Sequence, residues 1–171
     1  MDTWDAIRSR RNVRKYEDRA IDQADLNRIL EAGRRTPSSR NEQRWDLVVV
    51  ADRERLKRLS RVWRGAGHIA DSAATIALIA PDADDPGKRE SIQYDLGQLT
   101  MSIMLAATDL GVGTGHSAVR DQSLAREILE FPEDRFCAWL IALGHPADRP
   151  LEPIENPKRR PFDSLVHEET W

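Results

Sequence analysis

Two stretches of the sequence carry residue types that could hold an anionic, planar ligand. The first reads SRRNVRKY, from Ser9 to Tyr16, and its arginines offer planar guanidinium groups that suit bidentate contact with phosphate. Arg10, Asn12 and Arg14 alternate, so in an extended segment all three side chains point to the same side. A grip on phosphate is one interpretation of this stretch, and a solvated run of charge is the other.

The second stretch is a polar loop from Pro37 to Gln43 that leads into an apolar, β-branched run ending at Val50. Ser38, Ser39 and the amides that follow can both donate and accept hydrogen bonds, which suits the edges of a flat heterocycle. The β-branched run predicts a buried strand that would fix the geometry of the loop. The alternative is an ordinary surface turn, because serine and asparagine are common in turns.

Capping residues and apolar spacing predict the elements that position these stretches. The longest helix has Asp85 and Pro86 at its start and Gly111 at its end, and it is apolar nearly all round, which indicates burial in the core or against a second subunit. Further helices are expected over 3–10, from the N-cap Asp22 to a last turn at Arg34 and Arg35, after Asp52, and over 121–129. Core strands are expected over 46–51, 73–80 and 137–143.

Three other segments have a less regular pattern. Gly113, Thr114 and Gly115 predict a glycine-rich turn that lets the backbone approach something flat, although a helix precedes it where a dinucleotide fingerprint requires a strand. Residues 61–71 could form a mobile lid. The tail from 144 to 171 is rich in proline but keeps apolar residues, so we expect it to pack on a second subunit; disorder is the competing interpretation.

Composition excludes several classes of protein. A chain of 171 residues fits one domain, and a net charge of −3 argues against general binding of nucleic acid. Cys137 is the only cysteine, so no intramolecular disulfide is expected, and neither a signal peptide nor a membrane span is predicted, which fits a cytoplasmic protein. His68 and Asp71 alone do not make a metal site. His116 and Ser117 are adjacent without a nucleophile elbow, so no catalytic triad is expected.

Taken in order along the chain, these motifs resemble those of the nitroreductase family of FMN enzymes. The matching segments are SRRNVRKY, PSSRNEQRW, the stretch from Asp95 to Gly115, LGHP, and the closing KRRPFDSLVHEETW. The resemblance implies an α+β three-layer sandwich, with a mostly antiparallel central sheet flanked by helices. It also implies a homodimer with two FMN sites at the subunit interface, in which each chain is a single domain over 1–171 and its tail 144–171 packs on the partner.

The same resemblance implies a set of cofactor-binding residues. The FMN phosphate and ribityl chain would be held by Arg10, Arg11, Asn12 and Arg14, and the phosphate also by Arg159 and Arg160 from the tail. The flavin ring would be lined by Pro37, Ser38, Ser39 and Asn41 of the partner subunit, and on its other side by the backbone around Gly115, His116 and Ser117.

Three departures from the family pattern stand out. Asn12 replaces the usual serine, and it can still donate to an anion. Arg44 replaces the usual proline before Trp45, which places a charge near the mouth of the pocket and could favour an acidic substrate or the phosphates of the nicotinamide donor. Little is inserted between residues 51 and 73, so the helical lid of larger relatives is expected to be reduced.

The function implied is transfer of electrons from NAD(P)H through FMN to a small organic acceptor such as a nitroaromatic, a quinone or an enone. No catalytic acid or base is expected, because the flavin carries the chemistry and the protein positions it. Three alternatives stay open at this point. They are a flavin-dependent oxidase or dehydrogenase of a specialised metabolite, a non-catalytic flavin-binding protein, and a dimeric interaction protein without flavin.

Overall fold

The computed structural model describes residues 1–171, and a four-stranded antiparallel sheet lies at its centre. Each strand pairs with its neighbours in antiparallel register, in the order β1-β2-β4-β3. The β-branched and apolar runs in the sequence form the three strands that were expected, because such side chains pack well on a pleated surface. The strands are β1 (Asp46–Val50), β2 (Ala74–Pro81), β3 (Gly113–Ala118) and β4 (Arg135–Gly144).

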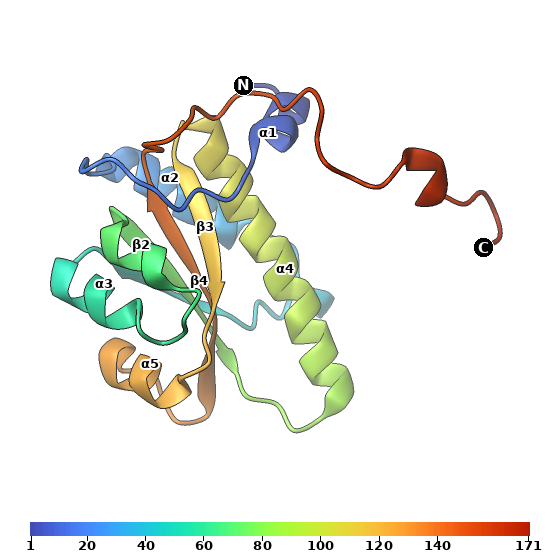
Figure 1. Ribbon diagram of the computed structural model, residues 1–171. Helices are drawn as coiled ribbons and strands as arrows, with labels where there is room; N and C mark the ends of the chain where they lie inside the picture. Colours follow the sequence, from blue (N-terminus) through green and yellow to red (C-terminus); the bar gives the residue numbers. More distant parts are fainter.

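Helices cover both faces of this sheet (Figure 1). Helices α2 (Gln23–Arg34) and α4 (Pro86–Asp109) pack on one face, and α3 (Arg53–Leu59) and α5 (Gln122–Leu129) pack on the other. Side chains alternate along β2, so Ile76 is buried with α2 and α4 while Ala77 is buried with α3 and α5. The predicted α+β three-layer sandwich is therefore confirmed. The short helix α1 (Thr3–Ser9) lies against α4.

Aspartates begin most of the helices as the sequence predicts. The carboxylates of Asp52, Asp85 and Asp121 each accept a hydrogen bond from a backbone N–H in the first turn of the helix that follows. Asp22 is the N-cap residue of α2 as expected, but its side chain makes no capping hydrogen bond to the backbone of the helix. Gly111 ends α4 with a φ of 72°, a left-handed conformation that glycine adopts without strain.

Two expectations about irregular segments were wrong. Residues 113–118 form β3 rather than a turn, because their backbone pairs along β4 from Gly113 to Ala118. Residues 61–71 do not form a lid, since Val62, Ala66 and Ile69 are buried in the core on the α3 side of the sheet. Three short 3-10 helices complete the structure, η1 (Ser39–Asn41), η2 (Gly67–Asp71) and η3 (Phe162–Ser164).

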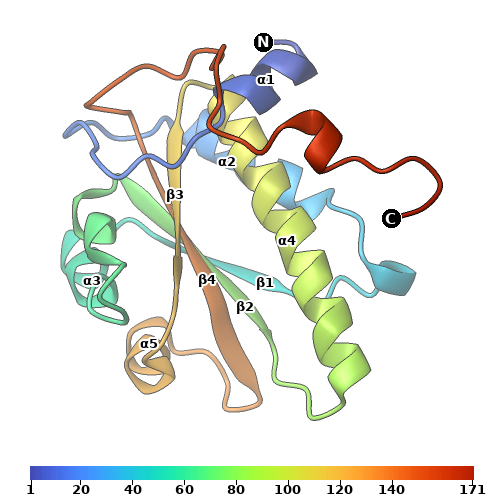
Figure 2. The same cartoon turned by 45° about the vertical axis from the view of Figure 1, so that its right-hand side comes forward.

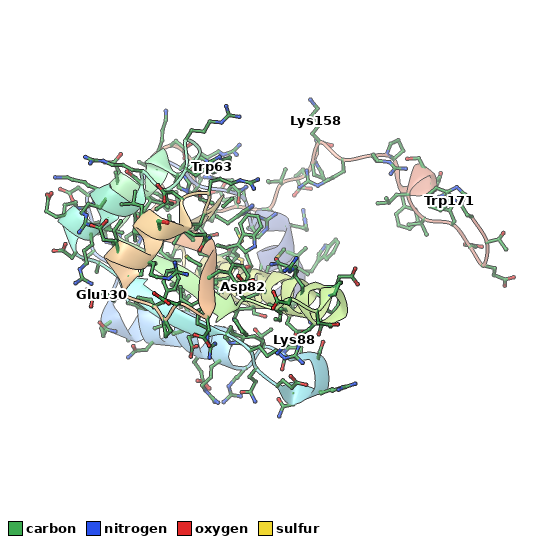
Figure 3. The ribbon with its side chains drawn as sticks, turned by 90° about the horizontal axis from the view of Figure 1, so that it is seen from below. Trp63, Asp82, Lys88, Glu130, Lys158 and Trp171 are labelled. Carbon is green, nitrogen blue, oxygen red and sulfur yellow. The ribbon has the colours of Figure 1, made fainter.

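Both ends of the chain lie on the same side of the molecule before the last residues project away from it (Figure 2). The tail first runs beside the N-terminal segment, where Ala147 N–H donates to the Lys15 carbonyl at 3.0 Å and Ile154 N–H to the Arg8 carbonyl at 3.2 Å. Residues from Lys158 to Trp171 then extend away from the body (Figure 3). No helix is both long enough and apolar enough to cross a membrane.

Candidate functional site

The N-terminal segment from Arg10 to Tyr16 is extended and covers the free edge of β3. Asn12 forms a parallel bridge with Thr114, and Val13 N–H donates to the Thr114 carbonyl at 2.8 Å. Burial alternates along the segment as the sequence predicts, because Arg11 and Val13 are buried whereas Arg14 is exposed. The segment therefore closes an open sheet edge and presents a row of polar side chains beside it.

Two cavities meet at Arg10. The larger has a volume of about 560 Å³ and lies between α1, α4 and the tail, with Arg10 and Arg159 among its walls. The second has a volume of about 350 Å³ and lies between α4 and the sheet, lined by Arg10, Gln93, Gly97, Thr100, Met101, Met104, His116 and Trp139. Both volumes lie in the range of small-molecule sites. The predicted Arg10, His116 and Arg159 are thus brought to one connected region, although they come from the segment after α1, from β3 and from the tail.

Three arginines of this region have no carboxylate partner, whereas Arg8, which also lines the larger cavity, is paired with Asp5 and with Glu155 of the tail. Arg10, Arg14 and Arg159 take part in none of the ion pairs of the structure, and Arg159 donates only to the carbonyl of Lys158, at 2.9 Å. Arg160 is exposed and donates to the Ser164 carbonyl. Arginines without an internal partner are available to an external anion.

Arg11 differs from the expectation that it faces the same anion. Its side chain is buried and its guanidinium donates to the carbonyls of Arg149 and, at 3.1 Å, Pro150, with Asp148 at 3.8 Å. Desolvation by this burial is the main cause that lowers its pKa. Arg11 therefore holds the start of the tail against the N-terminal segment.

Buried polar atoms without a hydrogen-bond partner gather on the same segments. Of the five such side-chain atoms in the protein, four belong to Ser9, Asn12, Thr114 and His116, and the fifth, in Arg126, lies on α5. A buried polar atom that stays unpaired costs free energy, so most native examples have a partner. Of these residues only His116 lines one of the two cavities, so its Nδ1 is the unpaired atom that a polar ligand there could satisfy.

Two histidines lie near β3, and both favour the neutral form. Burial lowers the pKa of His116, and the nearby charges of Arg14 and Arg10 lower it further. Burial also lowers the pKa of His68, whose Nε2 lies 3.2 Å from the Gly115 carbonyl. His116 packs edge-on against Trp139, with ring centroids 5.8 Å apart. A neutral imidazole in the wall of the 350 Å³ cavity can donate or accept one hydrogen bond.

Gly115 and Ser117 face the protein rather than open space. A Cβ on Gly115 would stand 2.3 Å from the Val13 carbonyl oxygen and 3.0 Å from both His68 Nε2 and Tyr16 Oη. The space that the missing side chain of Gly115 leaves is therefore occupied by atoms of the N-terminal segment and of η2. Ser117 is buried, and its hydroxyl donates to the Ala118 carbonyl at 3.1 Å.

The polar loop is fastened to α4 by a buried carboxylate. Asp95 is only 1% exposed and accepts from Ser39 N–H at 3.0 Å and from the Ser39 hydroxyl at 3.1 Å. Ser38 Oγ accepts from Gln43 N–H at 2.9 Å, which closes the loop on itself. Pro37 and Asn41 remain exposed and line neither cavity at Arg10. The structure thus fixes this loop rigidly while it presents two of the predicted side chains to the outside.

Comparisons with known proteins agree with this architecture. A model described as the nitroreductase family matches residues 7–76. A protein of Archaeoglobus fulgidus named NADH dehydrogenase/NAD(P)H nitroreductase is 33% identical over 96% of this chain and 96% of its own length. The chain belongs to the nitroreductase family. The names of its relatives are those of oxidoreductases, and this nitroreductase family member is an enzyme of that class.

Two further matches extend along the whole family domain. The FMN reductase [NAD(P)H] of Bacillus subtilis is 28% identical over 97% of this chain and 73% of its own length. The crystal structure of nitroreductase A from Vibrio parahaemolyticus superposes with a TM-score of 0.87 at 25% identity, and covers 100% of this chain and 77% of that protein. The sandwich described above is therefore the nitroreductase fold.

Sequence analysis missed Asp95 as a residue of this nitroreductase site. The signal was present, because Asp95 lies three residues after Ile92 and four before Leu99, both of which belong to the buried stripe of α4. An acidic residue at such a position needs a donor partner to be buried. The donor is Ser39, and no pattern within the helix indicates it.

Replacement of Asp95 by alanine is expected to lower the free energy of unfolding by about 2–3 kcal/mol, because the Ser39 donors would lose a charged acceptor. Urea denaturation measures this change. Asp95→Asn keeps the shape and one acceptor oxygen, so it should lose less than half as much. Equal stability of the alanine variant and the wild type would show that the loop does not depend on this carboxylate.

Proposed function

We propose that the protein is an FMN-dependent oxidoreductase that passes electrons from NAD(P)H to a small organic acceptor such as a nitroaromatic, a quinone or an enone. Family membership and the FMN reductase relative support the cofactor and the donor. The observation that carries the proposal for this chain is Arg10, which has no ion-pair partner and lies where two cavities meet, one of them also lined by His116 with its unpaired Nδ1.

The residues present fit a phosphorylated, planar cofactor. Arg10, Arg14 and Arg159 have no anionic partner of their own, and a phosphate dianion needs two or three cations when it leaves water. The unpaired atoms of Asn12 and His116 could satisfy the polar edges of the ligand. When bound, FMN supplies the hydride and electron transfer chemistry. The protein itself would neutralise the charge of the phosphate, orient the flavin ring and shield the cofactor from solvent.

We assign the binding roles as follows. Arg10, Asn12, Arg14 and Arg159 would hold the phosphate and ribityl chain, with Arg160 nearby on the tail. Arg11 would act indirectly, because its guanidinium binds the backbone at Arg149 and Pro150. His116, in the wall of the 350 Å³ cavity, would lie on one side of the ring, and Gly115 and Ser117, which face the protein, would act only by positioning it. The exposed loop of the partner subunit would complete the site through Pro37, Ser38, Ser39 and Asn41.

The proposed enzyme is a homodimer. Trp4 and Met101 are 64% and 43% exposed on α1 and α4, and they line the 560 Å³ cavity that one chain leaves open. The tail adds the exposed side chains of Phe162, Leu165 and Trp171, which lie in the part that extends away from the body of the protein. Apolar surface of this kind marks an interaction site. In the proposed dimer, residues 1–171 form one domain. The tail was expected to pack on the partner from 144 to 171, but Ala147 and Ile154 bond to the N-terminal segment of their own chain, so only the part after 155 is proposed to do so.

Absorbance and reduction measurements test the proposal. The protein is purified with FMN present, excess cofactor is removed, and the spectrum is recorded before and after anaerobic addition of NADH or NADPH. We expect a yellow protein whose flavin absorbance is lost within seconds of mixing with one donor and returns when a quinone is added. A yellow protein that neither donor bleaches would identify a non-catalytic flavin binder. A protein that stays colourless with added FMN would contradict the proposed flavin-dependent function.

A further inference from the structure

A third cavity, with a volume of about 400 Å³, opens where the polar loop meets the start of α4, and its walls contain no hydrophobic residue. Arg40 and Arg44 contribute from the loop, and Lys88 contributes from α4. Figure 3 labels Lys88 near the N-terminal end of this helix, beside the segment that carries η1. Ser39 and Ser91 add hydroxyl groups to the walls. The cavity is distinct in its lining from the two that meet at Arg10.

The charge of this cavity is positive. Three cationic side chains face one carboxylate, that of Asp85, which already accepts from Lys88 N–H at 2.7 Å as the cap of α4. Arg44 is paired with Glu42, and its NH1 also lies 3.5 Å from the Ser91 hydroxyl, so its guanidinium is held against α4. Arg40 and Lys88 have no ion-pair partner in the structure. These two side chains are free to turn toward an anion.

The chemistry of the walls selects the kind of ligand. Because no apolar or aromatic side chain lines the cavity, it offers no surface on which a nucleobase or nicotinamide ring could stack. Cations and hydroxyls instead suit a phosphorylated sugar. A phosphomonoester carries between one and two negative charges at neutral pH, and cations from two elements can contact its oxygens at once.

The position of the cavity relates it to the proposed site. It begins at Ser39, which lies in the loop that would line the flavin of the partner subunit. It continues along α4, the helix that also lines the 350 Å³ cavity from Gln93 onward. Lys88 and Gly97 are separated by about 14 Å along the helix axis at 1.5 Å per residue, which a dinucleotide can span.

We propose that this cavity binds the 2′-phosphate of the nicotinamide donor, so that the enzyme prefers NADPH to NADH. The inference rests on the proposed function for the identity of the donor. Arg40 and Lys88 are the residues that determine specificity, and Arg44 fixes the wall between them. NADH lacks the 2′-phosphate and would leave Arg40 and Lys88 without an anionic partner.

Binding of nucleotide fragments tests the site without any catalysis. Titration calorimetry on the holoprotein compares adenosine 2′,5′-bisphosphate with adenosine 5′-monophosphate in wild type, Arg40→Gln, Lys88→Gln and the double variant. We expect the bisphosphate to bind about a hundredfold more tightly to the wild type, and each substitution to weaken it about tenfold, as loss of a hydrogen bond to a charged group does. The double variant should bind both fragments equally. Lys57→Gln, on α3 and paired with Glu54, is the matched control.

Steady-state kinetics with both donors complete the test. The double variant should lose about a hundredfold in kcat/KM for NADPH and keep its value for NADH. Equal binding of the two fragments to the wild type would overturn the proposal, and so would fragment discrimination that survives in the double variant. If neither donor reduces the protein while bisphosphate binding still depends on Arg40 and Lys88, the phosphate site stands and the oxidoreductase function fails.

Discussion

Arg10→Gln is expected to fold like the wild type and to bind FMN about 10 to 100 times more weakly. Arg10 lines both of the cavities that meet in the candidate site and has no internal ion-pair partner. Loss of a hydrogen bond between charged groups costs roughly 1.5–3 kcal/mol, which corresponds to this range of affinity. Quenching of flavin fluorescence during titration of the apoprotein gives the dissociation constant.

Two variants accompany this measurement. Arg10→Lys keeps the charge but loses the planar fork, so its affinity should fall between those of the wild type and Arg10→Gln. Arg58→Gln removes an arginine on α3 that pairs with Glu127 of α5, on the face of the sheet opposite α4, and it should leave the affinity unchanged. An unchanged dissociation constant in Arg10→Gln would refute the assignment of the phosphate site.

Gly115→Val is expected to lower the free energy of unfolding by roughly 3 kcal/mol or more, which is at the upper end of the cost of overpacking. The first side-chain atom would stand 2.3 Å from the Val13 carbonyl oxygen, a backbone atom that cannot turn aside. The N-terminal segment would have to leave β3, and the bridge between Asn12 and Thr114 would be lost with it. Thermal and urea unfolding followed by circular dichroism measure the change.

Gly97→Ala provides the matched comparison. Gly97 lies inside α4, and a Cβ there meets nothing within 4 Å, so alanine should raise stability by about 0.5–1 kcal/mol through helix propensity. If Gly115→Val were as stable as the wild type, β3 would not need close contact with the N-terminal segment. A partial loss of FMN affinity should accompany the loss of stability in Gly115→Val, because Arg10 belongs to the displaced segment.

Local patterns were enough to predict most of the fold. Aspartate caps located the starts of α3, α4 and α5, and continuous β-branched or apolar runs located β1, β2 and β4. β3 was missed because its sequence, Gly-Thr-Gly-His-Ser-Ala, has neither apolar alternation nor strong β-propensity. Its conformation is decided by pairing with β4 and by cover from the N-terminal segment, which are both distant in sequence.

The candidate site could likewise be predicted only where it depends on local sequence and not where it depends on contacts between distant residues. Residue types alone indicated the basic segment, the polar loop and the basic tail. They could not separate Arg10 from Arg11, because two adjacent arginines are equivalent in composition and only the path of the tail buries one of them. The link between Asp95 and Ser39 joins residues that are 56 positions apart, so it too depended on the three-dimensional arrangement.

The meeting of the two chain ends has a consequence for how the protein matures during synthesis. The segment after α1 is translated among the first residues, yet its neighbours are β3 and the backbone near residues 147–154, which are translated more than 100 residues later. Arg10 therefore stays exposed on the nascent chain until the residues that pack beside it have been translated. The proposed cofactor site is therefore expected to form only after residues 147–154 have been made, and a chain truncated before residue 145 would lack the segment that holds Arg11 in place.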